Sequence, residues 1–305
     1  MSEMIRSLKE ALDYTRLYRD QTFVIKVGGE VLGSRKVLDE VAVQVALLES
    51  LSIRVVLVHG GGPQATELSR RLGLEPQMVA GRRVTTPEVL EVAKMVYAGQ
   101  LNVDVLSALR ARGVRAVGLS GIDAGLVTAT RRPPVEVKDD DGATRTVDYG
   151  EVGDIESVDA AVLEQLLPAG VVPVIASLAA DAQGRPLNVN ADSLAEALAR
   201  SLKAKKLVFM TGAPGLLRDP ADPSSLVAFA TPDDLVGLLE GGAVRGGMRP
   251  KVEACLRAVA GGVRRTHIID GRTPDALLVE LFTGHGCGTM IVASREAAEY
   301  EAQEW

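Results

Sequence analysis

Phe23-Val24-Ile25-Lys26-Val27-Gly28-Gly29 decides the fold: it is a short run, apolar apart from its lysine and rich in β-branched residues, that ends in two glycines. The same pattern returns in Val55-Val56-Leu57-Val58-His59-Gly60-Gly61-Gly62-Pro63. Such runs are typical of strands that are covered on both faces of a parallel sheet. The segments that follow, 36–51 and 64–72, are polar or amphipathic and indicate crossover helices. The chain is therefore predicted to be an α/β protein.

The glycines that end the two runs predict an anion-binding site. Glycine at the carboxyl end of a strand lets backbone N–H groups close around an anion, and the following helix adds its positive end. Two such loops on neighbouring strands can face one oxyanion, and Lys26 places a cation beside it. Strand-to-helix turns often use glycine for structural reasons alone, so the indication of function comes from the pair of loops together with the lysine.

Composition narrows the class of protein. The 305 residues are 47% hydrophobic but only 3% aromatic, which favours an enzyme-like α/β interior over an aromatic-rich binding module. A formal net charge of −6 argues against a nucleic-acid-binding platform. Cys255 and Cys287 are far apart and lack metal-ligand spacing, which fits a reducing compartment. The sequence shows neither a signal peptide nor a transmembrane run, so we expect a cytoplasmic protein that binds no membrane and no nucleic acid.

The rest of the chain continues the alternation of strands and helices. A long helix over 87–109 is predicted to be capped by Thr86 and to begin at Pro87. Further helices are predicted over 3–18, 158–167, 193–202, 232–239, 249–259 and 274–281, and further strands over 116–119, 171–175, 207–210, 266–269 and 289–292. The helix over 3–18 has no place in the first βαβ unit. It either packs on its own domain or docks on another subunit, and both interpretations stand.

Between 123 and 152 the pattern changes. Two β-like runs, 126–130 and 144–149, flank a polar tip at 138–142, which predicts a β-hairpin with an acidic end. We interpret the aspartates of the tip as a solvated loop rather than as metal ligands.

A cluster of polar residues precedes the helix over 193–202. Asn188, Asn190 and Asp192 are spaced two apart, so in an extended stretch their side chains point the same way. An N-cap explains one of them but hardly all three. Lys251 falls in the first turn of the helix over 249–259, where a cation is unfavourable with the helix dipole unless an anion lies nearby. We interpret both features as functional.

Several well-known sites are missing from the sequence. There is no P-loop, no Gly-x-Gly-x-x-Gly after a strand and no Gly-x-Ser-x-Gly, and His59, His267 and His285 lack metal-ligand spacing. Glycine loops, two lysines, an arginine and an Asn/Asp cluster remain. This set suits phosphoryl transfer, in which the enzyme mainly positions two anions and neutralises spreading charge.

Six motifs, in order along nearly the whole chain, resemble the N-acetylglutamate kinases of the amino acid kinase family. They are Lys26-Val27-Gly28-Gly29, His59-Gly60-Gly61-Gly62-Pro63, Gly81-Arg82-Arg83-Val84-Thr85, Asn188-Val189-Asn190-Ala191-Asp192, Gly246-Gly247-Met248-Arg249-Pro250-Lys251 and His267-Ile268-Ile269-Asp270-Gly271-Arg272. The resemblance implies an open αβα sandwich with a mostly parallel sheet. It also implies an N-terminal helix (1–20), an N-terminal lobe for the acyl amino acid (21–185) and a C-terminal lobe for MgATP (186–305).

The reaction that the resemblance implies is ATP-dependent phosphorylation of the side-chain carboxylate of N-acetyl-L-glutamate, in arginine biosynthesis. Lys26 and Lys251 would stabilise charge on the transferring phosphoryl group, and Asp192 would orient both lysines. Gly28 and Gly29 complete the implied catalytic set. The implied substrate-binding set is Gly61, Gly62, Arg83, Asn188 and Asn190, and the nucleotide-binding set is Thr211, Gly212, Gly215, Gly247 and Met248. Mg²⁺ would be held mainly through the phosphates of ATP, with no dedicated protein site.

Three positions depart from the family pattern. Gly212 stands where an aspartate is frequent, which leaves contacts to adenine or ribose open. Ile122 replaces a frequent lysine, and Glu30 replaces a small residue and adds negative charge near the phosphate site.

The N-terminal helix resembles the arm that interlaces dimers into hexamers in arginine-inhibited relatives. The resemblance thus implies a homo-oligomer, either a dimer or a hexamer, and makes arginine inhibition a hypothesis. The candidate effector residues are Lys206, His267, Glu280 and Gly288.

Two other functions stay open. One is a sister kinase that would act on an aminoadipate or glutamate linked to a carrier protein. The arginine-rich stretch Arg131-Arg132-Pro133-Pro134 leaves this alternative open. A catalytically silent amino acid sensor of the same fold is the other, although a sensor has no need for both Lys26 and Lys251.

Overall fold

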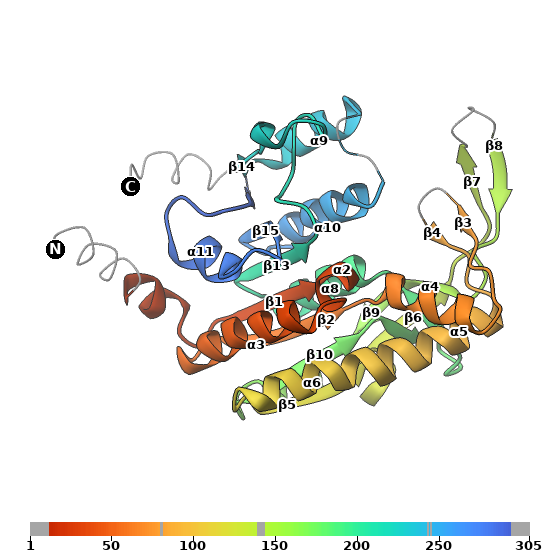
Figure 1. Ribbon diagram of the computed structural model, residues 1–305, viewed down its shortest axis with the longest axis horizontal. Coiled ribbons are helices and arrows are strands. Elements are labelled where there is room, and N and C mark those ends of the chain that lie inside the picture. The colour runs from red at the N-terminus through yellow and green to blue at the C-terminus, as the bar shows by residue number, and fades with distance from the viewer. Residues whose placement is uncertain (1–11, 80–81, 139–143, 243, 245, 294–305) are drawn as a thin grey trace.

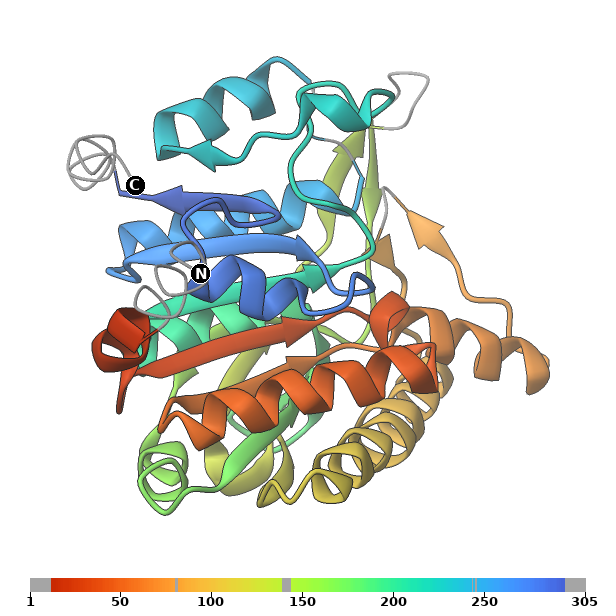
Figure 2. The same cartoon turned by 60° about the vertical axis from the view of Figure 1, so that its left-hand side comes forward.

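The computed structural model describes residues 12–79, 82–138, 144–242, 244 and 246–293 (Figure 1). Helices pack on both faces of a central twisted sheet, as Figure 2 shows from a second direction. Among the described residues, no helix combines the length and the apolar character needed to cross a membrane.

The central sheet has eight strands in the described part of the chain, in the order β14-β16-β15-β13-β1-β2-β10-β5. Its strands are β1 (Thr22–Val27), β2 (Arg54–His59), β5 (Ala116–Ser120), β10 (Val172–Ala176), β13 (Lys206–Thr211), β14 (Phe229–Ala230), β15 (Arg265–Asp270) and β16 (Thr289–Val292). Every neighbouring pair is parallel except β15 and β16. The predicted mostly parallel sheet is therefore confirmed, and β1 and β2 are neighbours as expected.

Two apolar cores cover the two faces of the sheet. Along β1, Phe23, Ile25 and Val27 pack into the core beneath α3 (Arg35–Ser50), α6 (Asn102–Ala111) and α11 (Ala276–Phe282). Val24 lies in the opposite core, with α8 (Ala191–Ser201), α9 (Pro232–Glu240) and α10 (Met248–Ala260). Because side chains alternate along a strand, Lys26 faces the same way as Val24, toward α8. This alternation brings the lysine to the first turn of α8.

A small closed barrel and two hairpins stand beside the sheet. The barrel is formed by β6 (Val127–Arg131), β9 (Val152–Val158), β11 (Leu178–Ala180) and β12 (Pro186–Val189), and the hairpins pair β3 (Met78–Val79) with β4 (Arg82–Arg83) and β7 (Val135–Lys138) with β8 (Thr144–Val147). Helix α7 (Ala161–Leu166) leads from the barrel back to β10.

The predicted hairpin was wrong in its first arm. The run 126–130 belongs to β6 and pairs with β9, whereas the partner of β8 is β7. Pro133 and Pro134 separate β6 from β7, because proline cannot donate to a strand ladder. Most of the predicted tip, 139–142, lies outside the described residues.

The long predicted helix is present but is not regular. Helix α5 (Pro87–Lys94) begins after Thr86, whose side chain accepts a hydrogen bond from Val89 N, so the predicted cap is confirmed. A π-helical segment, Met95–Leu101, then joins α5 to α6. The sequence pattern did not predict this segment.

The predicted N-terminal helix is described only over 12–18. The ring of Tyr18 meets the rings of Phe23 and Phe282 edge-on, with centroids 5.2 and 6.0 Å apart. This end of the helix is thus packed between β1 and α11. The part over 3–11 lies outside the described residues.

Candidate active site

The two glycine loops meet at the carboxyl edge of the sheet. The loop after β1 leads into α2 (Gly29–Leu32), and the loop after β2 leads into α4 (Gly62–Arg71). The side chain of Gln64 donates a hydrogen bond to the carbonyl oxygen of Gly29, 2.7 Å away. A Cβ atom on Gly29 would lie 2.8 Å from Cδ of Pro63, so only glycine allows this approach. The first N–H groups of α4 have no partner within the helix and can meet an anion.

Gly28 plays a different part from Gly29. Its N–H donates to the carbonyl oxygen of Met210, 2.9 Å away, and so links the first loop to β13. The N–H of Gly28, which belongs to the implied catalytic set, is thus engaged within the protein.

A buried carboxylate joins the two predicted lysines. The Oδ1 atom of Asp192 lies 2.8 Å from Nζ of Lys26, and its Oδ2 atom lies 3.3 Å from Nζ of Lys251. Lys251 also donates to the carbonyl oxygen of Gly247, 3.1 Å away. Burial opposes ionisation of Asp192, but the charges of Lys26 and Lys251 outweigh it and hold the pKa of this carboxyl below its ordinary value. The three residues therefore form a cation–anion–cation arrangement at the point where β1, α8 and α10 converge.

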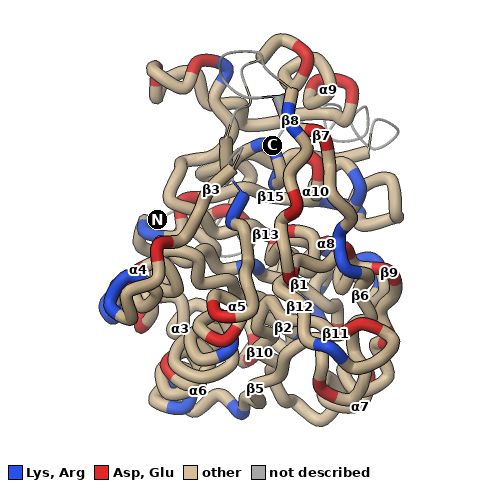
Figure 3. Tube along the Cα trace, turned by 90° about the vertical axis from the view of Figure 1, so that its right-hand side faces the viewer, with Lys and Arg blue, Asp and Glu red and all other residues tan. Residues whose placement is uncertain are grey.

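This arrangement opens into a cleft of about 550 Å³. The predicted site residues that line it are Lys26, Gly29, Gly61, Gly62, Arg83, Asn188, Asn190, Asp192, Gly247 and Lys251. Figure 3 looks at the molecule from the side of the hairpins, where basic and acidic positions are interspersed and do not form one basic stripe.

Arg83 reaches into the cleft from the β3–β4 hairpin. Its Nη2 atom donates to the carbonyl oxygen of Gly62, 2.8 Å away, and to the hydroxyl of Thr66. Its Nη1 atom is buried, yet within the described part of the chain no group accepts a hydrogen bond from it. A buried donor without an acceptor is costly unless a ligand supplies one. The guanidinium is thus arranged to receive an anionic group from the cleft.

The predicted Asn/Asp cluster is built differently from the expectation. The extended stretch ends at Val189, and Asn190 is the N-cap of α8, accepting from the N–H groups of Asp192 and Ser193 at 2.9 Å each. Asp192 therefore lies in the first helical turn, and the expected alternation of three side chains does not occur. Asn188 donates to the hydroxyl of Thr85, 3.1 Å away.

The positions predicted for the nucleotide divide into two groups. Gly247 lines the cleft and immediately precedes Met248, the first residue of α10. Thr211 ends β13, Gly212 and Gly215 follow that strand, and none of the three lines the cleft. Thr211 closes a local turn, since its hydroxyl accepts from the N–H of Ala213 at 2.9 Å.

Two of the three departures from the family pattern are in contact. The Oε2 atom of Glu30 accepts from the N–H of Gly212, and Arg272 donates to the carbonyl oxygen of the same glycine. Arg272 is itself paired with Asp270.

Some residues that line the cleft were not predicted. They include Tyr97, Tyr149 and Ser177. Ser177 directly follows β10 at the same sheet edge as the glycine loops, and this position was the available signal. Tyr97 and Tyr149 come from a helix and a loop whose patterns carry no such signal.

The four candidate effector residues come together at another place. Nζ of Lys206 lies 3.1 Å from Nε2 of His267, whose Nδ1 lies 2.7 Å from Oε1 of Glu280. Oε2 of Glu280 accepts from the N–H of Gly288 at 3.0 Å. Burial lowers the pKa of Lys206 to about 7 and that of His267 to about 4. A cavity of about 220 Å³ beside this cluster is also lined by Tyr14 and Tyr18 of the N-terminal helix.

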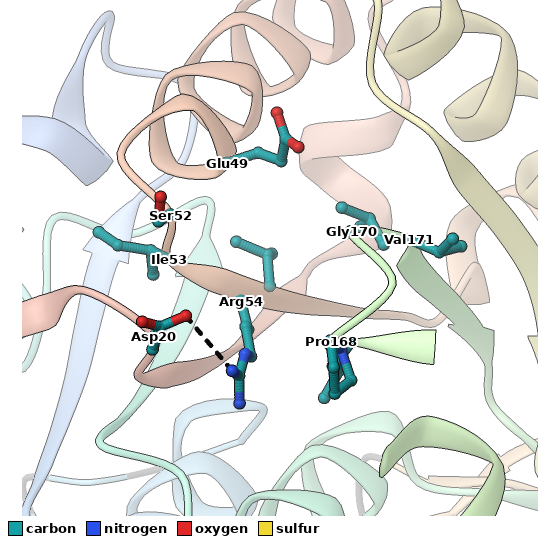
Figure 4. A pocket seen from close by; sticks show the side chains of 11 residues that line it. Asp20, Glu49, Ser52, Ile53, Arg54, Pro168, Gly170 and Val171 are labelled. Carbon is teal, nitrogen blue, oxygen red and sulfur yellow. Dashed lines mark hydrogen bonds and ion pairs between the residues drawn. The ribbon is translucent and has the colours of Figure 1, made fainter. Parts of the chain in front are cut away.

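A further cavity, of about 230 Å³, lies at the amino ends of β1, β2 and β10, opposite the glycine loops (Figure 4). Its polar groups include an ion pair between Asp20 and Arg54, 3.3 Å apart. None of the residues predicted to be functional lines it. Over the whole described part of the chain, no three His, Cys, Asp or Glu side chains are grouped so as to hold a metal ion.

The sequence profile of the amino acid kinase family matches residues 21–270. An acetylglutamate kinase of Myxococcus xanthus is 49% identical over 298 residues, which are 97% of this chain and 96% of that protein. An acetylglutamate kinase of Symbiobacterium thermophilum is 45% identical, over 93% of this chain and 96% of that protein.

A solved structure with a similar fold is the N-acetylglutamate synthase of Neisseria gonorrhoeae. In its complex with coenzyme A and N-acetyl-glutamate it gives a TM-score of 0.80 at 29% identity, over 94% of this chain and 63% of that chain. In its complex with coenzyme A and L-arginine it gives a TM-score of 0.78 at 26% identity, over 98% of this chain and 70% of that chain.

Proposed function

Because this chain belongs to the amino acid kinase family, we propose that it is an acetylglutamate kinase, which transfers the γ-phosphoryl group of ATP to the side-chain carboxylate of N-acetyl-L-glutamate in arginine biosynthesis. One observation carries the proposal: Asp192 holds Lys26 and Lys251 on either side of it, in a cleft that both glycine loops reach. Two cations fixed by one carboxylate suit a reaction in which negative charge spreads between an acceptor and a leaving group.

The chemistry needs no general base. The acceptor carboxylate is already ionised at neutral pH, since its ordinary pKa is about 4.3. One of its oxygens forms a bond to the γ-phosphorus as the bond to the β,γ-bridging oxygen breaks, so that an acyl phosphate and ADP result without proton transfer. Lys26 and Lys251 neutralise the charge on the transferring group, and Asp192 keeps both lysines in place. The residues of the site thus act by position and charge.

The two lobes would divide the substrates between them. The N-terminal lobe, 21–185, would bind the acceptor, with Gly29, Gly61 and Gly62 presenting N–H groups. Arg83 would receive the α-carboxylate on its buried Nη1 atom, and Asn188 and Asn190 would complete this subsite. The bond from Gly28 to Met210 would hold the loop in shape.

The C-terminal lobe, 186–305, would bind ATP through Thr211, Gly212, Gly215, Gly247 and Met248. Of the acidic side chains that line the cleft, Asp192 is engaged by two lysines, so the donor set fits a Mg²⁺ ion carried mainly by phosphates. Such an ion would neutralise phosphate charge. We place the enzyme in the cytoplasm, where ATP is available and the free thiols of Cys255 and Cys287 stay reduced.

The decisive experiment measures ADP release by the purified protein with MgATP, with and without N-acetyl-L-glutamate, and traps acyl phosphate with hydroxylamine. Hydroxamate that forms only with N-acetylglutamate is the expected result. Product with a carrier-linked aminoadipate or glutamate instead would move the assignment to a sister kinase. Binding of N-acetylglutamate without any product would favour the silent sensor.

We also propose that L-arginine inhibits the enzyme at the cavity beside Lys206, His267, Glu280 and Gly288. The carboxylate of Glu280 and the aromatic rings of Tyr14 and Tyr18 offer partners for a guanidinium group. The synthase of Neisseria gonorrhoeae, which has a similar fold, has been solved with L-arginine. Activity that stays unchanged in saturating L-arginine would refute inhibition, and Glu280→Gln should raise the arginine concentration needed for half inhibition.

Self-association through the N-terminal helix is proposed on the basis of its exposed face. Leu12 and Leu17 are 51% and 53% exposed, while Tyr18 is buried against the body of the protein. Apolar side chains that point outward from a docked helix favour burial against a second copy. Light scattering should give the mass of a dimer or hexamer, and the double substitution Leu12→Glu, Leu17→Glu should lower that mass if the helix forms the contact.

A further inference from the structure

We propose that His59 and Asn102 are positioning residues that set the orientation of the second glycine loop, and that the π-helical segment Met95–Leu101 exists to bring Asn102 to His59. The inference deepens the proposed function and rests on it, because the loop concerned is the one that would present N–H groups to the acceptor and the phosphoryl group.

The imidazole of His59 is a fixed connector. His59 ends β2, its side chain is buried, and its Nδ1 atom lies 2.9 Å from the carbonyl oxygen of Gly60. The Nδ2 atom of Asn102 lies 3.2 Å from Nε2 of His59 and 3.0 Å from the carbonyl oxygen of Val174. An amide nitrogen can only donate, so Nε2 must accept and Nδ1 must carry the proton. The neutral imidazole therefore donates to the first peptide group of the glycine loop.

Burial supports the same protonation state. It is the main reason why the pKa of His59 is lowered to about 4, and the charge of Lys26 acts in the same direction. The imidazole is thus neutral at physiological pH, and this tautomer persists while Asn102 donates to it.

The π-helical segment faces the same loop. A Cβ atom on Gly61 would lie 2.3 Å from Cδ1 of Leu101 and 2.8 Å from Cδ1 of Tyr97, so both side chains rest directly on the backbone of that glycine. In a π-turn the hydrogen bond joins residues five apart, and the N–H of Asn102 accordingly meets the carbonyl oxygen of Tyr97. Tyr97 and Asn102 then follow one another along the same side of the helix. π-Helical turns are rare and frequently occur at functional sites.

The far side of Asn102 is constrained as well. A Cβ atom on Gly118, in β5, would lie 1.9 Å from Oδ1 of Asn102. Only glycine at this position leaves room for the amide. A continuous set of contacts therefore runs from β5 through Asn102 and His59 to Gly60, the residue before the two glycines of the acceptor subsite.

Such support matters because N–H groups stabilise developing charge only when they are already aimed at it. If the side chain at 102 is shortened, His59 keeps its bond to Gly60 but loses the donor that fixes its tautomer and its ring. The loop then samples other orientations, and both acceptor binding and turnover should suffer.

The test compares His59→Gln, His59→Asn and Asn102→Ala with Val103→Ala. His59→Asn retains a donor for Gly60 but is too short to meet Asn102, whereas His59→Gln retains an acceptor for Asn102 but not the donor to Gly60. Val103 is the neighbour of Asn102 on the same helix and is 59% exposed, so its substitution is the matched control. Measured quantities are the melting temperature, kcat, KM for each substrate, and binding of N-acetyl-L-glutamate and of ADP by calorimetry.

We expect kcat and N-acetylglutamate affinity to fall roughly ten- to a hundred-fold in the His59 and Asn102 variants, with ADP affinity within about twofold of the parent. A purely structural role would lower the melting temperature alone and leave these constants equal to those of Val103→Ala, which would overturn the inference. If Asn102→Ala does not fold, Gly118→Ala takes its place, because it displaces the amide from the other side.

The kinase activity and the positioning role of His59 and Asn102 can be refuted by different results. A parent protein that neither binds N-acetylglutamate nor makes product contradicts the proposed function. In that case hydrogen exchange at the amides of Gly61 and Gly62 still decides the positioning role: exchange that is no faster in His59→Gln than in Val103→Ala contradicts it.

Discussion

The Oε2 atom of Glu30 lies 3.1 Å from the backbone nitrogen of Gly212, and this hydrogen bond joins the first turn of α2 to the loop after β13. Arg272 holds the carbonyl oxygen of the same glycine, so the backbone of residue 212 is bound through both its N–H and its C=O. A Cβ atom on Gly212 would lie 2.7 Å from Oε2 of Glu30. The carboxylate thus occupies the space that a side chain at 212 would need, and these two departures from the family pattern accommodate each other.

This contact predicts coupling between the two positions. Gly212→Ala should raise KM for ATP severalfold, because the new methyl group displaces the carboxylate that holds the loop. Glu30→Ala should do the same by removing the bond. The double variant should be less impaired than the sum of the two, with a coupling free energy of about 0.5–3 kcal/mol. Steady-state kinetics on the four proteins measures this cycle, and strictly additive effects would show that the two residues act independently.

The second prediction concerns Asp192. Asp192→Asn should lower the free energy of unfolding at pH 7 by about 3–5 kcal/mol, because two largely buried ammonium groups lose their counter-charge. The pKa of Asp192 is lower in the folded protein than in the unfolded chain, so its ionised form stabilises the fold above the unfolded pKa. That stabilisation is lost as pH falls through the lower, folded pKa. Urea unfolding of both proteins at several pH values should show a difference that is constant above about pH 5 and shrinks in acid.

Lys251 should matter for turnover more than for binding. Lys251→Ala removes one of the two cations that face the transferring group but leaves Arg83 and the glycine loops intact. We expect kcat to fall by about two to three orders of magnitude, while N-acetylglutamate affinity stays within about threefold. Calorimetry and the hydroxamate assay together measure both effects. Equal binding and equal turnover in parent and variant would remove Lys251 from the catalytic set.

Arg83 should matter for the acceptor alone. Arg83→Lys keeps the charge but cannot form the planar two-pronged contact, so KM for N-acetylglutamate should rise about tenfold or more. KM for ATP should not change, because the side chain of Arg83 donates its hydrogen bonds to Gly62 and Thr66 of α4, at the loop proposed to bind the acceptor. Initial rates with each substrate varied in turn make the comparison. A rise in KM for ATP of the same size would contradict the assignment of Arg83 to the acceptor.

Much of the fold was predictable because a short apolar run that ends in glycine indicates both a strand and the position of its carboxyl end. Parallel strands share that edge, which is why the loops after Val27 and His59 were expected to meet, as they do. The hairpin at 126–149 was assigned wrongly because its first run pairs with β9, which follows only after a long intervening segment. A local turn signal predicts pairing between adjacent runs and cannot predict pairing over such a distance.

The site was predictable only in part. Lys26, Asp192 and Lys251 are far apart in sequence, and the family motifs rather than any spacing brought them together. Asn102 was missed because the apolar stripe of its helix is also compatible with a regular α-helix, and periodicity does not reveal one π-turn. The available sign was the asparagine itself, because it is a weak helix former that stands inside the helix predicted over 87–109.

The position of β1 in the sheet has a consequence for how the chain folds during synthesis. Strand β1 pairs on one side with β13, which is synthesised much later, and Val27 meets Met210 only after 210 − 27 = 183 further residues have been added. At about 5–20 residues per second, that interval is roughly 10–40 s, during which one edge of β1 has no partner from its own chain. Contacts of such long range also slow folding. A truncation that ends before residue 206 lacks β13 and therefore leaves an open edge on β1, which favours aggregation.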